Sequence, residues 1–245
     1  QNGTTQTTDT TPGCMAQSPV LKARDLSVTR GTRTVIQKLD LEIFRGDIVC
    51  LVGENGSGKT TLIESLVGII PLTKGQVEWF SEKDEPLIIR NYSGTRKKPH
   101  PFGLTLQSDG VCGEEKVTER LITALNVSGI DCSQLEAKQI LEEWGMSHRG
   151  EDRVSQLSAG LRRRLAVISG LAPAMMCEAP RLVFLDEPSE GLDSFSKGVL
   201  KKWIGELSQY GNAIVMASHD EEIIACSSRI LTIESGEISE SKNNI

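Results

Sequence analysis

The stretch GENGSGKTT, from Gly53 to Thr61, constrains the fold of this chain more than any other segment. It directly follows the apolar run DIVCLV, which is typical of a strand buried on both faces of a sheet. It leads into TTLIESLVGII, in which apolar residues recur at helical spacing. A glycine-rich loop between a strand and a helix binds phosphate groups, because its backbone N–H groups turn inward and the positive end of the helix points at them. The sequence therefore predicts an α/β fold that binds a nucleotide.

The loop fits the pattern G-x-x-x-x-G-K-[ST] without deviation. Lys59 is expected to neutralise the β- and γ-phosphates, and the Thr60 hydroxyl to bind Mg²⁺. A chance glycine-rich turn is the alternative interpretation, and the flanking strand and helix argue against it. We assign nucleotide binding to every residue of the loop: Gly53, Glu54, Asn55, Gly56, Ser57, Gly58, Lys59, Thr60 and Thr61.

Hydrophobic patterning predicts the remaining elements. Between residues 20 and 44, three segments alternate apolar and polar residues and indicate short antiparallel strands, and GQVEWF and EPLIIRN indicate further edge strands. Residues 114–149 show the spacing of amphipathic helices. Two more buried strands, RLVFLDEP and NAIVMASHD, flank a helix at 194–210. Alternation of buried strands and helices predicts a parallel sheet with crossover connections.

The predicted fold class is therefore an α/β P-loop NTPase core with a mostly parallel sheet, an N-terminal antiparallel β subdomain and an inserted helical subdomain. We expect a single domain over residues 18–245, with the nucleotide-binding core at 18–106 and 157–245 and the helical subdomain at 107–156. Residues 1–17 are polar and rich in threonine, which predicts a disordered tail, and Met15 is a candidate initiator.

Composition excludes several classes of protein. The net charge of −6 argues against a general nucleic-acid binder, which would favour a basic balance. The six cysteines form no C-x-x-C pair, so free thiols in a reducing compartment are expected rather than disulfides or a metal site. No apolar run reaches the roughly 18 residues that a membrane-spanning helix requires. The N-terminal stretch lacks the features of a signal peptide.

Polar residues follow two of the predicted buried strands. LVFLDEP delivers Asp186 and Glu187, and IVMAS is followed by His219. In an open α/β sheet, ligands bind beyond the carboxyl ends of the strands. Asp186 is thus placed to hold Mg²⁺, and Glu187 to polarise a water molecule for attack on the γ-phosphate. A solvated acidic strand end and a structural histidine are the alternatives. Gln107 carries little information by its position alone.

With these elements in order, the chain resembles the ATP-binding cassette (ABC) family, the ATPase subunits of ABC transporters, over about residues 20–238. The signature is the most specific element, because other P-loop ATPases lack it. The six matching motifs are the Walker A loop at 53–60, the Q-loop residue Gln107, the signature LSAGL at 157–161, Walker B LVFLDE at 182–187, the D-loop SEGLD at 189–193 and the H-loop residue His219.

The resemblance implies a dimer of two cassettes, expected to be identical copies packed head to tail. Each ATP would lie between the Walker A loop of one cassette and the signature of the other, where Ser158 and Gly160 face the partner's γ-phosphate. The D-loop residue Asp193 is expected at the same nucleotide site. The resemblance assigns catalysis to Glu187, His219 and Gln107, and binding of Mg²⁺ to Thr60, Gln107 and Asp186, with ATP and Mg²⁺ as cofactors.

The resemblance also implies a separate transmembrane subunit, docked through a groove beside the helical insertion near Gln107. The chain is then expected to be cytoplasmic and peripheral on the inner face of a membrane, with no nucleic-acid partner. A soluble ABC ATPase acting on the ribosome or on nucleic acid is one alternative. It is disfavoured because the chain has one cassette and no room for a long coiled coil. A binding module that hydrolyses ATP poorly is another, and the intact Glu187 and His219 argue against it.

Several residues depart from the usual pattern of the family. Ala159 and Leu161 replace a glycine and a glutamine of the signature, and Glu190 stands in the D-loop where a small residue is common. The aromatic residue that stacks on adenine is missing, and Arg30 occupies its position, so we expect the Arg30 guanidinium to lie on the base. Arg162–Arg164 form either a solvated basic face or part of the phosphate field.

A finer resemblance connects the chain with the ATP-binding subunit of the cytochrome c biogenesis haem exporter. It rests on the TRG turn without an aromatic residue, the LSAG…RR signature, the compact length and the strand that contains Trp79. This resemblance implies haem export as one candidate function.

Overall fold

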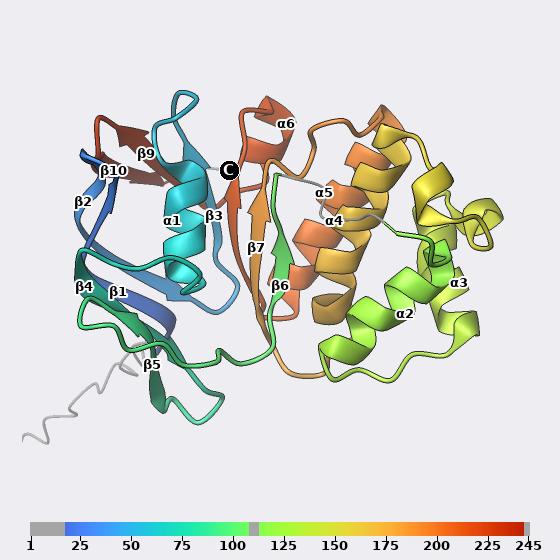
Figure 1. The fold of residues 1–245 in the computed structure, drawn as a ribbon, viewed down its shortest axis with the longest axis horizontal. Helices are drawn as coiled ribbons and strands as arrows, with labels where there is room; N and C mark the ends of the chain where they lie inside the picture. Colours follow the sequence, from blue (N-terminus) through green and yellow to red (C-terminus); the bar gives the residue numbers. More distant parts are fainter. Residues whose placement is uncertain (1–17, 108–112, 243–245) are drawn as a thin grey trace, which may run out of the picture.

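The computed structural model describes residues 18–107 and 113–242 (Figure 1). The expected disordered tail at 1–17 lies outside these residues. In chain order the elements are β1 (Pro19–Arg30), β2 (Arg33–Phe44), β3 (Ile48–Val52), α1 (Lys59–Leu66), β4 (Lys74–Phe80), β5 (Pro86–Asn91), β6 (Gly103–Thr105), α2 (Val117–Val127), α3 (Gln134–Glu143), the 3-10 turns Ser147–Arg149 and Val154–Gln156, α4 (Ala159–Met175), β7 (Leu182–Asp186), α5 (Ser194–Gln209), β8 (Ala213–Ala217), α6 (Glu221–Ile224), β9 (Arg229–Glu234) and β10 (Glu237–Lys242).

The N-terminal strands form a four-stranded antiparallel sheet in the order β2-β1-β4-β5. The expectation of three short strands over residues 20–44 was wrong, because the last two are one strand, β2. The strand continues through an irregularity at Lys38, which has a φ of 48° and donates its backbone N–H to the Ser27 hydroxyl. The strand β4, expected at an edge, lies inside the sheet, since both β1 and β5 pair with it.

The second sheet has six strands in the order β10-β9-β3-β8-β7-β6. All neighbours are parallel except β9 and β10, which confirms the predicted mostly parallel core. Every residue of β7 and β8 is buried, as the continuous apolar runs predicted. Because β3, β8 and β7 are parallel neighbours, their carboxyl ends meet at one edge of the sheet.

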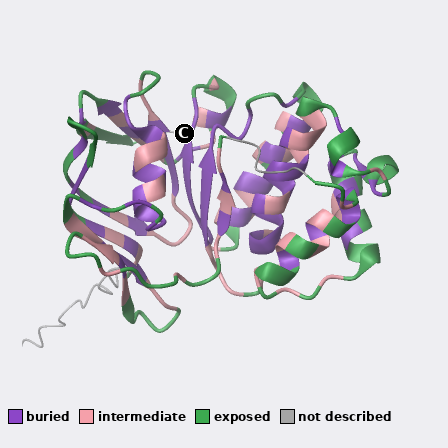
Figure 2. Ribbon diagram, viewed as in Figure 1, coloured by how far each residue is buried: buried purple, intermediate pink, exposed green. Residues whose placement is uncertain are grey.

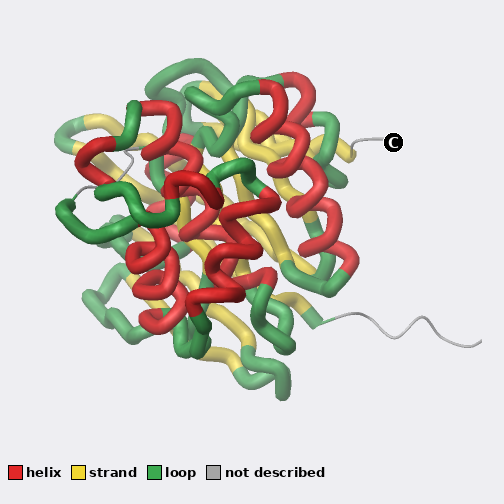
Figure 3. The backbone as a smooth tube through the Cα atoms, turned by 90° about the vertical axis from the view of Figure 1, so that its right-hand side faces the viewer, coloured by secondary structure: helices red, strands yellow, loops and turns green. Residues whose placement is uncertain are grey.

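The six-stranded sheet lies between two hydrophobic cores. One core is shared with the antiparallel sheet and α1, and the other with the helices α2 to α5. Figure 1 shows this layered order from the antiparallel sheet to the outer helices, and Figure 2 shows the buried residues concentrated on the parallel strands, α4 and α5. From the helical side, the helices cover the strands (Figure 3).

The expected helices between residues 114 and 149 are α2, which packs against α4, and α3, which packs against α2. Their buried side chains, such as Leu121 and Leu141, join the core formed with α4 and α5. Trp144 after α3 meets Trp203 of α5 edge-to-face, with ring centroids 5.3 Å apart. The boundaries assigned to the helical subdomain stay a prediction. No helix in the described part of the chain is long and apolar enough to cross a membrane.

Strand β6 and helix α4 approach each other closely through a pair of glycines. A Cβ atom on Gly170 would lie 2.8 Å from the backbone oxygen of Leu104, and one on Gly103 would lie 2.4 Å from the backbone oxygen of Gly170. Both distances are shorter than real Cβ atoms allow. The contact holds α4 against the strand that leads to Gln107.

We therefore expect Gly170→Ala to lower the free energy of unfolding by about 1–3 kcal/mol, the usual cost of overpacking a core. The matched control is Gly205→Ala in α5, where a Cβ atom would meet nothing within 4 Å. It should raise stability by up to about 1 kcal/mol, because alanine favours a helix. Denaturant unfolding measures both changes, and equal effects of the two variants would contradict the close contact.

Candidate active site

The predicted residues of the Walker A loop, Walker B and the H-loop converge on the carboxyl edge of the parallel sheet. The glycine-rich loop follows β3, Asp186 and Glu187 follow from β7, and His219 comes shortly after β8. The register aligns these ends, since Leu51 and Asp186 both pair with Ala217. The strand order thus brings together residues that are far apart in the sequence.

The loop wraps tightly around the start of α1. Gly58 has a φ of 119°, and a Cβ atom there would lie 2.6 Å from the side chain of Val35, so only glycine fits. Lys59 is buried, and its ammonium donates hydrogen bonds to the backbone oxygens of Gly53 at 2.8 Å and Glu54 at 3.2 Å. The loop therefore already holds the lysine that a phosphate would need.

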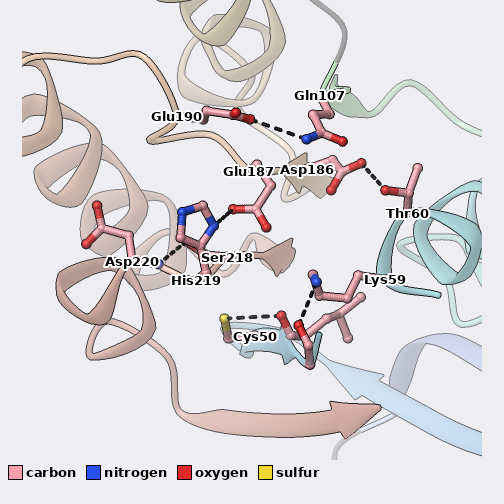
Figure 4. Close-up of polar contacts among 12 residues, drawn as sticks. Cys50, Lys59, Thr60, Gln107, Asp186, Glu187, Glu190, Ser218, His219 and Asp220 are labelled. Carbon is pink, nitrogen blue, oxygen red and sulfur yellow. Dashed lines mark hydrogen bonds and ion pairs between the residues drawn. The ribbon is translucent and has the colours of Figure 1, made fainter. Parts of the chain in front are cut away.

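Thr60 and Asp186 form a pair suited to a metal ion. The Thr60 hydroxyl donates to Asp186 Oδ2 at 2.7 Å (Figure 4). The pKa of Asp186 is raised, because burial outweighs the opposing effects of the hydrogen bond from Thr60 and the charges of Arg163 and Lys59. A hydroxyl and a carboxylate at the end of a phosphate-binding loop are the oxygen ligands that Mg²⁺ prefers. The donor set therefore fits this ion.

Glu187 and His219 form a second pair. Nδ1 of His219 lies 2.9 Å from Oε2 of Glu187, and the glutamate residue is only 6% exposed (Figure 4). Glu187 has a φ of 48°, which is unusual for a residue other than glycine and costs of order 1–3 kcal/mol. Its backbone N–H donates to the oxygen of Ala217 on β8. Strand β8 and His219 thus hold Glu187, whose backbone is strained, in one place.

Gln107 reaches the site from β6. Its side-chain amide donates to Oε2 of Glu190 at 3.4 Å, so the unusual D-loop glutamate contacts the Q-loop directly (Figure 4). Gln107 lies with Asp186 and Glu187 on the wall of a cleft of about 340 Å³. The other lining residues are Val35, Asn55, Gly56, Gly58, Lys59, Thr60 and Thr61. The remaining loop residues, Gly53, Glu54 and Ser57, line an adjacent cavity of about 590 Å³ together with Asn55 and Gly56.

The signature residues lie elsewhere. The Ser158 hydroxyl caps α4 by accepting the backbone N–H of Leu161 at 3.3 Å, and Gly160 faces the backbone oxygen of Gly191 in the D-loop. Asp193 caps α5 and pairs with Arg164. Ser158, Gly160 and Asp193 are not among the described residues that line the cleft.

Arg30, expected on the base, forms an ion pair with Glu64 of α1. Arg30 is not among the described residues that line the cleft, and its stacking on the base stays a prediction. Val35 was missed from the sequence, although it lines the cleft and packs against the loop at Gly58. No local pattern marks it, because it reads as an ordinary strand residue.

Both interpretations of Arg162–Arg164 were incomplete, because all three side chains hydrogen-bond to backbone oxygens. Arg162 donates to Leu157, Arg164 to Trp144, and Arg163 to residues of the two loops beside the cleft. Arg163 is buried and was also missed as a site residue. It lies on the same helical stripe as the buried Val167 and Gly170, a spacing that could have revealed its burial.

Residues 36–190 match the family model described as ABC transporter. The chain is 30% identical over 207 residues to the ergothioneine transport ATP-binding protein EgtV of Helicobacter pylori (strain G27), covering 83% of this chain and 91% of that protein. It is 32% identical over 225 residues to the zinc import ATP-binding protein ZnuC of Halorhodospira halophila (strain DSM 244 / SL1), covering 91% of this chain and 77% of that protein.

The fold is also that of solved cassettes. A dimeric ATP-binding cassette in a post-hydrolysis state, bound to ADP and Pi, superposes with a TM-score of 0.76 at 19% identity, over 91% of this chain and 98% of that chain. This likeness shows the shared architecture. The family match and the relatives carry the assignment: the chain belongs to the ABC transporter family and is an ATP-binding subunit that hydrolyses ATP.

Proposed function

We propose that this chain dimerises head to tail around two ATP molecules and drives a separate membrane subunit. The observation that carries the proposal is the meeting of the Thr60–Asp186 and Glu187–His219 pairs at the edge of the phosphate-binding loop. One pair supplies ligands for a metal ion and the other holds a carboxylate beside it. Phosphoryl transfer to water needs little more than such positioning and charge.

Each residue has a separate task in this mechanism. Lys59 and the loop N–H groups would bind the phosphates, and Thr60 and Asp186 would hold Mg²⁺, with Gln107 reaching the same cleft. When bound, the ion neutralises charge on the β- and γ-phosphates. Glu187 orients and polarises the attacking water, and His219 fixes the glutamate carboxylate. His219 is placed for this because its Nδ1 lies 2.9 Å from Oε2 of Glu187.

The dimer accounts for the signature. Ser158 and Gly160 stand at the N-terminus of a helix of 17 residues, where the positive end of the dipole favours an anion. They do not line this chain's own cleft, so the phosphate that they would hold belongs to a second copy. Asp193, in the adjacent D-loop, would lie at the same interface.

We place the docking site of the membrane subunit beside α1, in a groove that no described residue of α2 or α3 lines, rather than beside the helical insertion as expected from the resemblance. An apolar groove of about 520 Å³ there is lined by Val67, Ile69, Phe102 and Leu104, with the basic stretch Arg96–Lys98 at its rim. Phe102 and Leu104 belong to the segment that leads to Gln107. We propose that an amphipathic segment with acidic residues occupies the groove and holds the chain on the inner face of the membrane. Its movement would then reach the active site through β6.

The cargo depends on that membrane subunit. The relatives are named for ergothioneine and for zinc, which supports a shared motor that serves different cargoes. Haem export rests on the resemblance in the TRG turn, the signature, the compact length and the strand that contains Trp79. Trp79, one of its features, packs in the core against Phe102 and Phe184, so it reports on folding rather than on cargo.

We expect Glu187→Gln to bind ATP but to hydrolyse it at least about 10²-fold more slowly, the scale seen when a group that stabilises the transition state is removed. The variant should also accumulate as an ATP-bound dimer. Phosphate release and size-exclusion chromatography measure the two effects. The control is Glu221→Gln, the same substitution at an exposed position of α6, which should leave turnover and dimer formation unchanged. Retained turnover in Glu187→Gln would refute the role of Glu187.

Arg30→Ala should weaken ATP binding about 2–5-fold, because an exposed cation–π contact contributes about 0.5–1 kcal/mol. Calorimetric titration measures the affinity. Arg24→Ala on the same strand, which removes only a surface contact with Glu78, is the matched control. Equal affinities of Arg30→Ala and the unaltered chain would show that the guanidinium does not touch the base.

Reversing the basic rim with Lys97→Glu and Lys98→Glu should abolish copurification with the membrane subunit and leave basal ATP hydrolysis unchanged. The reason is that like charges would then face the acidic segment, whereas the cleft is not altered. Extraction in mild detergent followed by affinity capture measures the association. Lys202→Glu on α5 serves as the control, and undiminished capture of the rim variant would exclude this groove as the docking site.

A further inference from the structure

Arg163 connects two loops of the active site from beneath. Its Nη1 donates to the backbone oxygens of Leu106 at 2.6 Å and Gln107 at 3.3 Å. Its Nη2 donates to those of Asp186 at 2.9 Å and Glu187 at 2.6 Å. The residue is 4% exposed. A buried guanidinium therefore binds the backbone of the Q-loop glutamine and of both Walker B carboxylates.

These four backbone groups lie where the chain leaves its regular strands. Gln107 comes just after β6, and Glu187 comes just after β7 with a strained backbone. At these positions the Arg163 guanidinium donates to the backbone oxygens. The planar guanidinium provides several donors in a rigid arrangement, which one ammonium group could not reproduce.

Arg163 belongs to the helix that begins with the signature. Ser158 caps this helix, so Arg163 lies about one and a half turns after the cap. Hydrogen bonds within a helix make such a short segment rigid. A shift of the Ser158 end is therefore transmitted to the guanidinium, and from there to the backbones of Gln107 and Glu187.

We propose that Arg163 is a positioning residue that sets the backbone of Gln107 and Glu187 and couples the signature helix to this chain's own catalytic carboxylate. The coupling rests on the proposed head-to-tail dimer, in which the signature contacts the partner's ATP. Occupancy of one nucleotide site then alters the geometry of the other site through a single side chain. Among the described residues, Arg162 donates to Leu157, and Arg164 donates to Trp144 and Asp193, so neither contacts the Q-loop or Walker B backbone there.

The first test compares Arg163→Met with Arg163→Lys. The methionine removes all four hydrogen bonds and should lower kcat about 10–100-fold, as expected when a reacting group is misplaced by about 1 Å. The KM for ATP should change less than about 3-fold, because the four hydrogen bonds removed go to residues outside the phosphate-binding loop. The lysine retains a charge that reaches some of the oxygens, so its kcat should be intermediate. It also provides a folded variant if the methionine chain is unstable.

Arg149→Met is the control, since Arg149 pairs only with Asp152 near the surface in the described part of the chain. Its kcat should equal that of the unaltered protein. A purely structural role for Arg163 predicts that kcat and thermal stability fall together and that lysine does not restore activity. That result would overturn the proposal.

A double-mutant cycle tests whether Arg163 acts through Glu187. Single-turnover hydrolysis is measured for Arg163→Lys, Glu187→Gln and the combination. If Arg163 positions Glu187, Arg163→Lys should have little further effect once the carboxylate is gone. Multiplicative losses would overturn the proposal while leaving the role of Glu187 intact. Full turnover in Glu187→Gln alone would overturn both.

The coupling between sites has its own readout. Hydrolysis by the unaltered chain should depend cooperatively on ATP concentration, and Arg163→Lys should reduce the Hill coefficient towards 1. An unchanged Hill coefficient at a lowered kcat would limit Arg163 to its own site and refute the coupling. A non-cooperative unaltered chain would refute it as well.

Discussion

The parallel alignment of β3, β8 and β7 is the constraint on which the rest of the site depends. Their backbone ladders bring the carboxyl ends of three distant segments to one edge. The phosphate-binding loop, the two carboxylates and the histidine follow directly from those ends. Burial of the strands on both faces leaves no other register open to them, because a slip would disrupt both cores. Catalytic geometry is thus a consequence of packing.

Much of this arrangement could be predicted from the sequence. Continuous apolar runs indicated the buried strands, and the polar residues after them indicated the cleft, since a parallel sheet has only one carboxyl edge. Lys38 misled the prediction of β2, because a left-handed residue inside a strand interrupts the alternation that strand prediction uses. The interior position of β4 was missed because strand order depends on contacts between distant segments.

The features that local patterns could not reveal are tertiary contacts of charged side chains. Arg30 forms an ion pair with Glu64, Glu190 accepts a hydrogen bond from Gln107, and Arg163 donates to four backbone oxygens. Each partner comes from another part of the chain. The helical spacing of Arg163 with the buried Val167 and Gly170 indicates its burial, but it does not indicate which backbone oxygens the side chain contacts. Glu190 and Arg163 thus contact the Q-loop segment, and Arg163 also contacts Walker B, whereas Arg30 contacts α1. What distinguishes this cassette is therefore how its parts contact one another, and not which reacting groups it carries.

In the proposed dimer, the signature of a second copy completes the nucleotide site of this chain. Cross-linking tests it most directly, with Asn55→Cys in one copy, Ala159→Cys in the other and the native cysteines replaced. A short thiol-reactive linker should join the two copies in the presence of ATP and Mg²⁺, and not without nucleotide. Equal cross-linking with and without ATP, or cross-linking only between two copies of the same cysteine variant, would contradict this arrangement.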